Sequence, residues 1–273
     1  MPFNELEDSL SDGQPVKLYQ FVRGTQQWTY ASGDRDISHL ARVYRSLAGG
    51  ISDAGLTQGG EDGTNNVRIT APGDLDVAQL YRGIPPSDTI ELVIYEMHYG
   101  DPDYRVSFVG EVQGVSFPAA DRCEIRCSPE SVSMQSQGLK LCWERACPHS
   151  LYGRGCTVDR NAYAVAATIT GIDGVVISVT GVGSYSDGWF NAGYIEWPVS
   201  NGNYDRRAIE SHVGNDLTIF GGVEGLSVTQ DIVAYPGCDQ TPTTCNTKFG
   251  NMPNYGGFRH MPGRSPFDGN PVF

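Results

Sequence analysis

Four cysteines in the C-terminal half of the chain have a spacing that could bind a metal. Cys147 and Cys156 have eight residues between them, and Cys238 and Cys245 have six. Each pair lies in a turn-rich, polar segment, where a loop can fold two thiolates around one centre. Four thiolates suit a tetrahedral zinc ion or an iron–sulfur cluster, so the sequence predicts one metal site built from both pairs.

The identity of the metal stays open on spacing alone. The two-residue spacing that is common in structural zinc sites is absent from both pairs, although wider loops also hold zinc. No flavin or nicotinamide fingerprint accompanies the cysteines in the sequence. We therefore expect the metal to act as a structural staple rather than as a redox centre.

Three further cysteines bring the total to seven: Cys123, Cys127 and Cys142. Cys123 and Cys127 are an even step apart in a strand-like stretch, so they would share one face of a strand. Free cysteine often behaves as a small buried hydrophobe, and we expect these three to serve packing.

An enzymatic alternative uses Cys147 or Cys156 as a nucleophile and His149 as its base, which would make a cell-wall peptidase. Cys147 and His149 are only two residues apart, which is too local for the usual geometry of such a pair. A nucleophilic thiolate also needs an open, electropositive surrounding that this sequence does not indicate. His212 lies in a strand pattern and is expected to be structural.

A second alternative is a receptor- or glycan-binding tail module with Trp189, Tyr194 and Trp197 along a sugar-binding cleft. Aromatic residues within strands are more often core or interface residues. Glu196, beside Trp197, could belong to a glycosidase pair, but no spacing among the 32 acidic residues singles out a partner for it.

The composition favours a mainly β protein. The chain has 273 residues with 34 Gly, 16 Pro and 14 Tyr, and only 39% of its residues are hydrophobic. This balance is typical of short strands joined by turns rather than of long amphipathic helices. The length predicts two domains, with boundaries at 1–135 and 136–273.

The net charge of −13 disfavours a nucleic-acid partner or an anionic membrane, since both would repel the chain. The N-terminus lacks the basic and apolar regions of a signal peptide, and no apolar run is long enough for a membrane span. We expect a chain that is made and folded in the cytoplasm, where thiols stay reduced and often bind metals.

The first predicted domain is a series of short strands with one short helix at Asp74–Tyr81. The segment Leu47–Asn66 is rich in Gly, Asp, Asn and Thr and is expected to be a mobile surface loop. Alternation of apolar and polar residues and flanking turn signals predict strands at Val16–Val22, Gln27–Ala31, Val67–Ala71, Thr89–His98, Tyr104–Val115 and Cys123–Ser128.

The second predicted domain has enough strands for a small β-barrel or sandwich, bracketed by the two cysteine pairs. After Cys245 the chain is rich in Pro and Gly and is expected to form an irregular C-terminal segment whose aromatic residues are interface anchors. The predicted strands are Ala164–Ile169, Val175–Thr180, Gly193–Trp197, Ala208–Val213, Leu217–Phe220 and Ser227–Ala234.

The sequence resembles the tail-tip hub proteins of long-tailed phages, the group that includes minor tail protein L of phage lambda and the hub protein of gene transfer agents. The similarity is densest from Leu141 to Pro262 and looser in Asn66–Pro72 and Val106–Val112. The residues that carry this similarity are Cys147–Gly153 with Cys156, Trp189, Gly193–Trp197, Gly237–Asp239 with Cys245, Phe249, Asn251, Asn254 and Gly257–Phe258.

The resemblance implies a structural role in the virion. In this family four cysteines with the same within-pair spacings ligate a [4Fe–4S] cluster, which implies that role for Cys147, Cys156, Cys238 and Cys245. It also implies a homotrimer of two similar hub domains per subunit, assembled in the host cytoplasm. Such a trimer adapts the hexameric tail tube to the trimeric central tip, and genome DNA only passes through its lumen.

Overall fold

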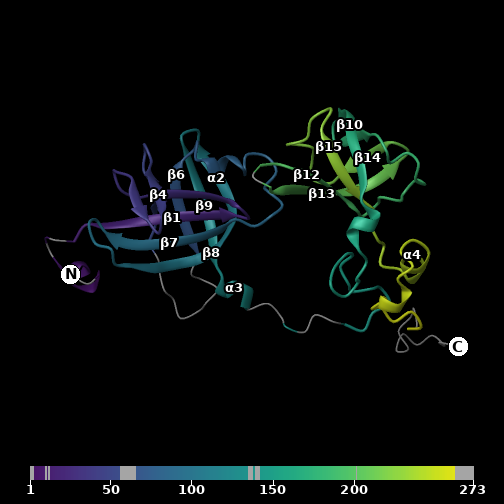
Figure 1. Cartoon of the computed structure of the whole chain (residues 1–273), viewed down its shortest axis with the longest axis horizontal. Coiled ribbons are helices and arrows are strands. Elements are labelled where there is room, and N and C mark those ends of the chain that lie inside the picture. Colours follow the sequence, from purple (N-terminus) through teal and green to yellow (C-terminus); the bar gives the residue numbers. More distant parts are fainter. Residues whose placement is uncertain are drawn as a thin grey trace. The chain divides into compact units, whose positions relative to one another are not determined.

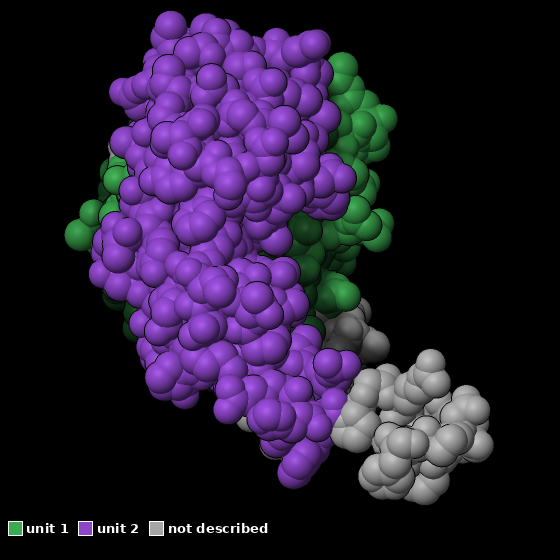
Figure 2. Space-filling model, turned by 90° about the vertical axis from the view of Figure 1, so that its right-hand side faces the viewer, with its two compact units in different colours: residues 1–136, 199–205 green, residues 137–198, 206–273 purple. Residues whose placement is uncertain are grey.

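The computed structural model describes residues 3–9, 11, 13–55, 66–134, 138, 142–200 and 202–261 (Figure 1). The chain divides into two compact units, coloured separately in Figure 2. The first contains Met1–Ser136 and Val199–Asp205, and the second contains Gln137–Pro198 and Arg206–Phe273. The predicted boundary between residues 135 and 136 lies outside the described residues.

The first unit is built on a nine-stranded sheet with the order β3-β4-β2-β1-β7-β8-β9-β6-β5. Neighbouring strands pair in antiparallel fashion except β2 and β4, which are parallel. The strands are β1 (Pro15–Arg23), β2 (Gln26–Ala31), β3 (Ile37–His39), β4 (Arg42–Ser46), β5 (Ser52–Asp53), β6 (Val67–Pro72), β7 (Glu91–His98), β8 (Tyr104–Ala119) and β9 (Arg122–Pro129). The short helices are α1 (Phe3–Glu7), α2 (Asp76–Gln79) and α3 (Ser131–Met134).

Apolar side chains cover both faces of the central strand β1. Tyr19 and Phe21 belong to the larger core, whereas Val16 and Leu18 belong to a second core on the other side. Successive side chains of a strand point to opposite faces, so the nearly continuous burial of β1 follows from its having a core on each side.

The second unit contains a closed barrel with the strand order β10-β11-β14-β13-β12-β15. Trp197 and Phe190 are the largest side chains of its core. The strands are β10 (Val165–Asp173), β11 (Val176–Val179), β12 (Tyr194–Pro198), β13 (Tyr204–Val213), β14 (Asp216–Ile219) and β15 (Asp231–Tyr235). The first and last strands pair with each other, with Val165 opposite Ala234.

Residues 142–164 and 236–261, which flank the barrel in the sequence, pack together into what we call the cysteine lobe. Its regular elements are the 3₁₀ helices η2 (Arg160–Tyr163) and η3 (Met252–Asn254) and the helix α4 (Pro242–Thr247). Backbone hydrogen bonds join the two segments, from Cys147 N to the Gln240 carbonyl at 3.0 Å and from Phe258 N to the Glu144 carbonyl at 2.8 Å. Figure 1 shows the two segments together, in teal and yellow.

The prediction of a mainly β protein with a barrel in its second half is confirmed. The prediction of a mobile loop at Leu47–Asn66 is wrong for its first part, because Ile51 is buried in the core and Ser52–Asp53 form β5. A contact that is distant in sequence, the ion pair between Asp53 and Lys17, holds this part in place. Residues 56–65 lie outside the described residues.

The helix predicted at Asp74–Tyr81 is shorter, at Asp76–Gln79, and continues as turns. No helix within the described ranges is long and apolar enough to cross a membrane.

Candidate metal centre

The four cysteines of the two predicted pairs line a single cavity of about 180 Å³ in the cysteine lobe. Cys147 and Cys245 are buried, and Cys156 and Cys238 are half-buried. The structure therefore brings together all four residues that the sequence analysis assigned to one site. His149, Gln240, Phe249, Asn251 and Tyr255 also contribute to the wall of the cavity.

Local sequence signals fold the second cysteine pair. The Asp239 carboxylate accepts hydrogen bonds from the backbone N and the hydroxyl of Thr241, at 3.0 and 2.8 Å, which makes a tight turn after Cys238. Thr241 then caps α4 by accepting from Thr244 N, and Pro242 stands in the first turn of this helix. Cys245 is thereby held on a short helix.

Three of the four sulfurs accept an N–H hydrogen bond. Gly256 N donates to Cys147 Sγ at 3.4 Å, and Gln240 N donates to Cys238 Sγ at 3.3 Å. Asn251 Nδ2 lies 3.6 Å from Cys156 Sγ. Such donors stabilise a sulfur that carries negative charge, as a metal-bound thiolate does, and they tune the properties of metal–sulfur centres.

The electrostatics of the metal-free site favour protonated thiols. Burial raises the pKa of Cys245, and the neighbouring Cys147, Cys156 and Cys238 raise it further. Burial also raises the pKa of Cys238, although the hydrogen bond from Gln240 N lowers it. Four thiolates this close together would repel one another, so a bound cation would favour their deprotonation.

The segment Asn251–Gly257 closes one side of the cavity. Asn251 Nδ2 donates to the Cys156 carbonyl, and Asn251 N donates to the Cys245 carbonyl at 3.0 Å. Tyr255 donates its hydroxyl to the carbonyls of Arg145 and Gln240, at 2.5 and 3.2 Å. This segment therefore binds both cysteine loops and, through Gly256, one cysteine sulfur.

His149 stands at the wall of the cavity between two glycines. A Cβ atom added to Gly155 would lie 2.4 Å from His149 Nδ1, and one added to Gly256 would lie 2.4 Å from His149 Nε2. The ring therefore requires glycine on both sides. The sulfurs of Cys147 and Cys156 have Gly256 and Asn251 as their hydrogen-bond donors, not the ring of His149, which is not the geometry of a Cys–His catalytic pair.

Backbone strain is concentrated around the site. Among the described non-glycine residues with positive φ are Tyr152 (63°), Thr157 (59°) and Gln240 (61°) in the lobe and Ala192 (57°) in the cavity wall. Left-handed backbone at such residues costs about 1–2 kcal/mol each and tends to cluster at functional sites. The surrounding contacts therefore hold these loops in shapes that the chain would not adopt alone.

The four cysteine sulfurs are donors that suit either a zinc ion or an iron–sulfur cluster. Four thiolates around zinc all lie about 2.3 Å from one point. Among the described residues no three His, Cys, Asp or Glu side chains form a group that could hold one ion. The cysteines line a cavity of about 180 Å³, well above the roughly 10–15 Å³ needed to hold one water molecule.

Aromatic contacts connect the lobe to the barrel. The Tyr152 ring packs edge-on against Phe249, which lines the cavity, and against Tyr235 of β15. Lys248 Nζ donates to the Gly237 carbonyl at 2.7 Å and to the Trp189 carbonyl, and it lies 4.7 Å from the Trp189 ring centre. The lobe and the barrel thus share one continuous set of contacts.

The remaining candidates from the sequence lie outside the cavity. Cys123 and Cys127 are buried in the core of the first unit, as expected for packing residues, whereas Cys142 is exposed. Trp197 is buried in the barrel core, which removes it from any sugar-binding surface. His212 is buried, with its Nε2 2.9 Å from the Gly214 carbonyl.

Glu196 is part of a charged cluster rather than of a carboxylate pair. Its Oε2 lies 2.7 Å from Arg206 Nε and 3.4 Å from Arg160 NH1. The carboxylate is nearly buried, and its other oxygen, Oε1, accepts from the Tyr235 hydroxyl at 3.5 Å, so its described contacts are those of a structural ion pair.

Sequence reasoning missed the groups that donate hydrogen bonds to the sulfurs. Gln240 and Gly256 act through backbone N–H groups, which leave no mark in the residue type. Asn251 acts through its side chain, and its place six residues after Cys245 was noted only as part of the family resemblance.

Part of this chain matches a family profile that is described as phage-conserved. Residues 188–265, which include Cys238 and Cys245, match the profile of a family described as "Phage conserved hypothetical protein BR0599". An uncharacterized protein of Xylella fastidiosa (strain 9a5c) is 29% identical over 190 residues, which are 63% of this chain. That match covers 38% of the relative's length.

The fold is shared with a solved virion structure. A chain of the virion of a native gene transfer agent (GTA) particle matches with a TM-score of 0.77 and 18% identity, over 99% of each chain. At this identity the likeness shows that the two chains have the same fold.

Proposed function

We propose that this protein is a structural component of a virion, located at the tail tip, where it serves as a hub subunit. The observation that supports this role is the fold likeness to a gene transfer agent virion chain over essentially the whole length. The match of residues 188–265 to a phage-conserved family points in the same direction. A hub subunit needs rigid modules rather than an active site, and a large sheet and a closed barrel provide them.

In this proposal the subunits form a homotrimer that adapts a hexameric tail tube to a trimeric central tip. Its partners are tail tube or distal tail proteins on one side and the central hub or receptor-binding protein on the other. Two hub domains per subunit would give six contacts to the tube. The nine-stranded sheet and the six-stranded barrel differ in topology, so the six contacts would be similar in position rather than in structure.

We further propose that Cys147, Cys156, Cys238 and Cys245 hold a [4Fe–4S] cluster. The observation that carries this assignment is the convergence of these four side chains on one cavity, with N–H donors at three sulfurs. When bound, the cluster supplies four iron–thiolate bonds that cross-link the two segments of the lobe. Asn251 and the Gly256 and Gln240 amides orient the sulfurs and offset their charge.

Zinc is the alternative metal, and it would keep the role of a staple. A peptidase using Cys147 or Cys156 with His149 remains the enzymatic alternative, and its geometry is not supported by the contacts of either sulfur. A role in receptor or glycan binding would have to use a surface other than the buried Trp197.

The metal assignment is tested by anaerobic purification followed by an optical spectrum and by assays for iron, sulfide and zinc. We expect broad visible absorption, with iron and sulfide in equal amounts. A Cys238→Ser variant should lose both, whereas Cys142→Ser, which changes an exposed cysteine of the same lobe, should keep them. If the purified protein is colourless and contains zinc, the site is a zinc site rather than a cluster site. If it contains no metal, the proposed metal site is refuted.

The assembly role is tested by mass measurement of the purified protein and by complementation. We expect a trimer in solution or on the tail tube. Particles that lack this chain should have defective tail tips, and the wild-type chain should restore them. Normal tails without the chain would refute the role.

A further inference from the structure

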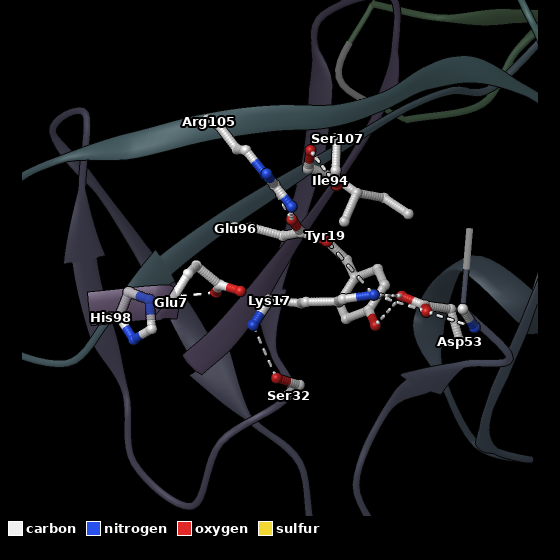
Figure 3. Close-up of polar contacts among 11 residues, drawn as sticks. Glu7, Lys17, Tyr19, Ser32, Asp53, Ile94, Glu96, His98, Arg105 and Ser107 are labelled. Atoms are coloured by element: carbon white, nitrogen blue, oxygen red, sulfur yellow. Dashed lines mark hydrogen bonds and ion pairs between the residues drawn. The ribbon is translucent and has the colours of Figure 1, made fainter. Parts of the chain in front are cut away.

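A polar cluster in the first unit carries a chemistry that the proposed function does not use. Figure 3 shows the side chains of Lys17 and Tyr19, from β1, converging on Asp53, from β5. Lys17 Nζ lies 2.8 Å from Asp53 Oδ1 and 3.0 Å from Oδ2, so the amine faces the carboxyl group directly. The two residues are 36 positions apart in the chain.

The arrangement places an amine against the carboxyl group with which it could condense. Since Cγ is bonded to both oxygens, Nζ lies near it as well. Reacting atoms in near-attack conformers are roughly 3–3.5 Å apart. The Tyr19 hydroxyl donates a hydrogen bond to Asp53 Oδ2 at 2.9 Å. A donor at that oxygen polarises the carboxyl group and would stabilise negative charge that develops there during attack on Cγ.

A second carboxylate stands where a general base is needed. Glu96 of β7 is the direct cross-strand partner of Lys17, and its Oε1 lies 3.5 Å from Lys17 Nζ. Arg105 holds the other oxygen, Oε2, at 2.7 Å. This ion pair fixes the orientation of the Glu96 carboxylate toward the amine.

The cluster is largely excluded from water. The side chain of Asp53 is 2% exposed, that of Glu96 is 16% exposed and that of Lys17 is 29% exposed. Tyr19 is fully buried. Burial disfavours the charged form of the Asp53 carboxyl group, and it removes the water that would reverse a condensation.

We propose that Lys17 and Asp53 condense to an intramolecular isopeptide bond, with Glu96 as the general base and Tyr19 as the oxyanion donor. In the ion pair, a proton first passes from Nζ to an Asp53 oxygen, which gives a neutral amine and a neutral carboxyl group. Rotation about Cβ–Cγ turns the carboxyl face toward Nζ, and Nζ attacks Cγ. Glu96 takes a proton from the nitrogen and returns it to the departing hydroxyl, so that one water leaves and one amide forms.

The competing interpretation is a simple buried ion pair. Burial raises the pKa of Asp53, but the hydrogen bonds from Lys17 and Tyr19 lower it, and the net result is a lowered pKa. The ion pair is therefore the resting state from which the reaction starts. What distinguishes this cluster from an ordinary pair is the addition of a base near the amine and of an oxyanion donor bonded to the carboxyl group.

The bond would have a clear structural effect. β5 is the edge strand of the nine-stranded sheet, and it pairs with β6 through only two residues. An amide from Asp53 to Lys17 would join this edge covalently to the central strand β1. Such a bond would keep the edge in place under force or heat that breaks hydrogen bonds.

The test is the intact mass of the denatured full-length chain, followed by fragment analysis. We expect the wild-type chain to be lighter than its sequence by one water, and a branched peptide to contain both Lys17 and Asp53. The Lys17→Arg variant keeps the positive charge but should show the full sequence mass. A wild-type chain that also has its full sequence mass overturns the proposal.

Glu96→Gln tests the base. General-base catalysis typically contributes at least about 100-fold to a rate, so freshly made Glu96→Gln protein should contain an uncondensed fraction that the wild type lacks. Glu91→Gln, on an exposed position of the same strand, is the matched control and should condense fully. Full condensation in Glu96→Gln would overturn the role of Glu96.

Discussion

Asn251 links the two halves of the cysteine lobe, and its substitution gives the sharpest test of how the site is held together. Its Nδ2 donates to the carbonyl of Cys156 and approaches the sulfur of the same residue. Its Oδ1 accepts from Asn254 Nδ2 at 2.7 Å. Asn251→Ala removes all these side-chain contacts but keeps the backbone bond to the Cys245 carbonyl.

The expected decrease in the free energy of local opening follows from the hydrogen bonds that the Asn251 side chain makes. An intramolecular hydrogen bond contributes about 1 kcal/mol net, and a buried acceptor left without its donor costs about 1–3 kcal/mol. Asn251→Ala should therefore lower the free energy of local opening of the lobe by about 2–3 kcal/mol. At about 1.4 kcal/mol per tenfold, this corresponds to roughly 30- to 150-fold more frequent opening.

Amide hydrogen exchange measures this opening directly, at the amides of Cys147 and Gly256, whose hydrogen bonds depend on the closed lobe. In metal-loaded protein the same variant should release its metal to a chelator about 10- to 100-fold faster, as expected for loss of a group that orients a ligand. Asn254→Ala, which loses only the bond to Asn251, is the control and should show less than half the effect. Exchange identical to wild type in Asn251→Ala would refute this account of the lobe.

Three further outcomes are expected. Burial raises the pKa of Cys127 from 9.0 to about 12, so the folded state holds this proton more tightly than the unfolded state. The contribution of Cys127 to the free energy of unfolding is therefore complete below pH 9 and falls by up to about 4 kcal/mol as the pH rises toward 12. Cys127→Ala should remove this pH dependence from the free energy of unfolding measured in urea. Glu196→Gln should lower the free energy of unfolding of the barrel, measured in urea, by about 2 kcal/mol. This loss is smaller than the loss from breaking a fully buried ion pair, because both arginines are about 40% exposed. No change would contradict the ion-pair interpretation. Loading metal into the metal-free protein in weakly buffered solution should release protons, because the raised pKa values of Cys238 and Cys245 keep these thiols protonated before metal binds. The Cys238→Ser variant should release fewer protons. An unchanged pH would contradict protonated thiols.

Much of the β structure could be predicted because its signals are local. All twelve predicted strands have a counterpart, for example β9 at Arg122–Pro129 for the predicted Cys123–Ser128. The strands β3, β4 and β5 were missed because their sequences are short and polar. β5 is ordered by the Lys17–Asp53 contact, and no local pattern encodes a partner 36 residues away.

The grouping of four cysteines around one cavity was predictable from residue type and spacing, but the contacts that support them were not. The helix α4 was missed because Pro, Thr and Asn are poor helix formers, although Thr241 followed by Pro242 is an N-cap signal that could have been used. The tail aromatics were expected to be interface anchors. Tyr255 bonds to Arg145 and Gln240 within the lobe, a contact that depends on the folded site, and residues 262–273 lie outside the described residues.

The pairing of β10 with β15 gives the barrel an arrangement with an evolutionary consequence. Because Val165 lies opposite Ala234, the chain enters and leaves the barrel at neighbouring points, and the cysteine lobe is completed by the segments on either side. The barrel is thus inserted between the two segments of the cysteine lobe. Its loops can lengthen or shorten, or the whole barrel can be exchanged, without changing the distance between the two cysteine loops. This arrangement would allow related chains to vary what they present to their partners while keeping the same four-cysteine base.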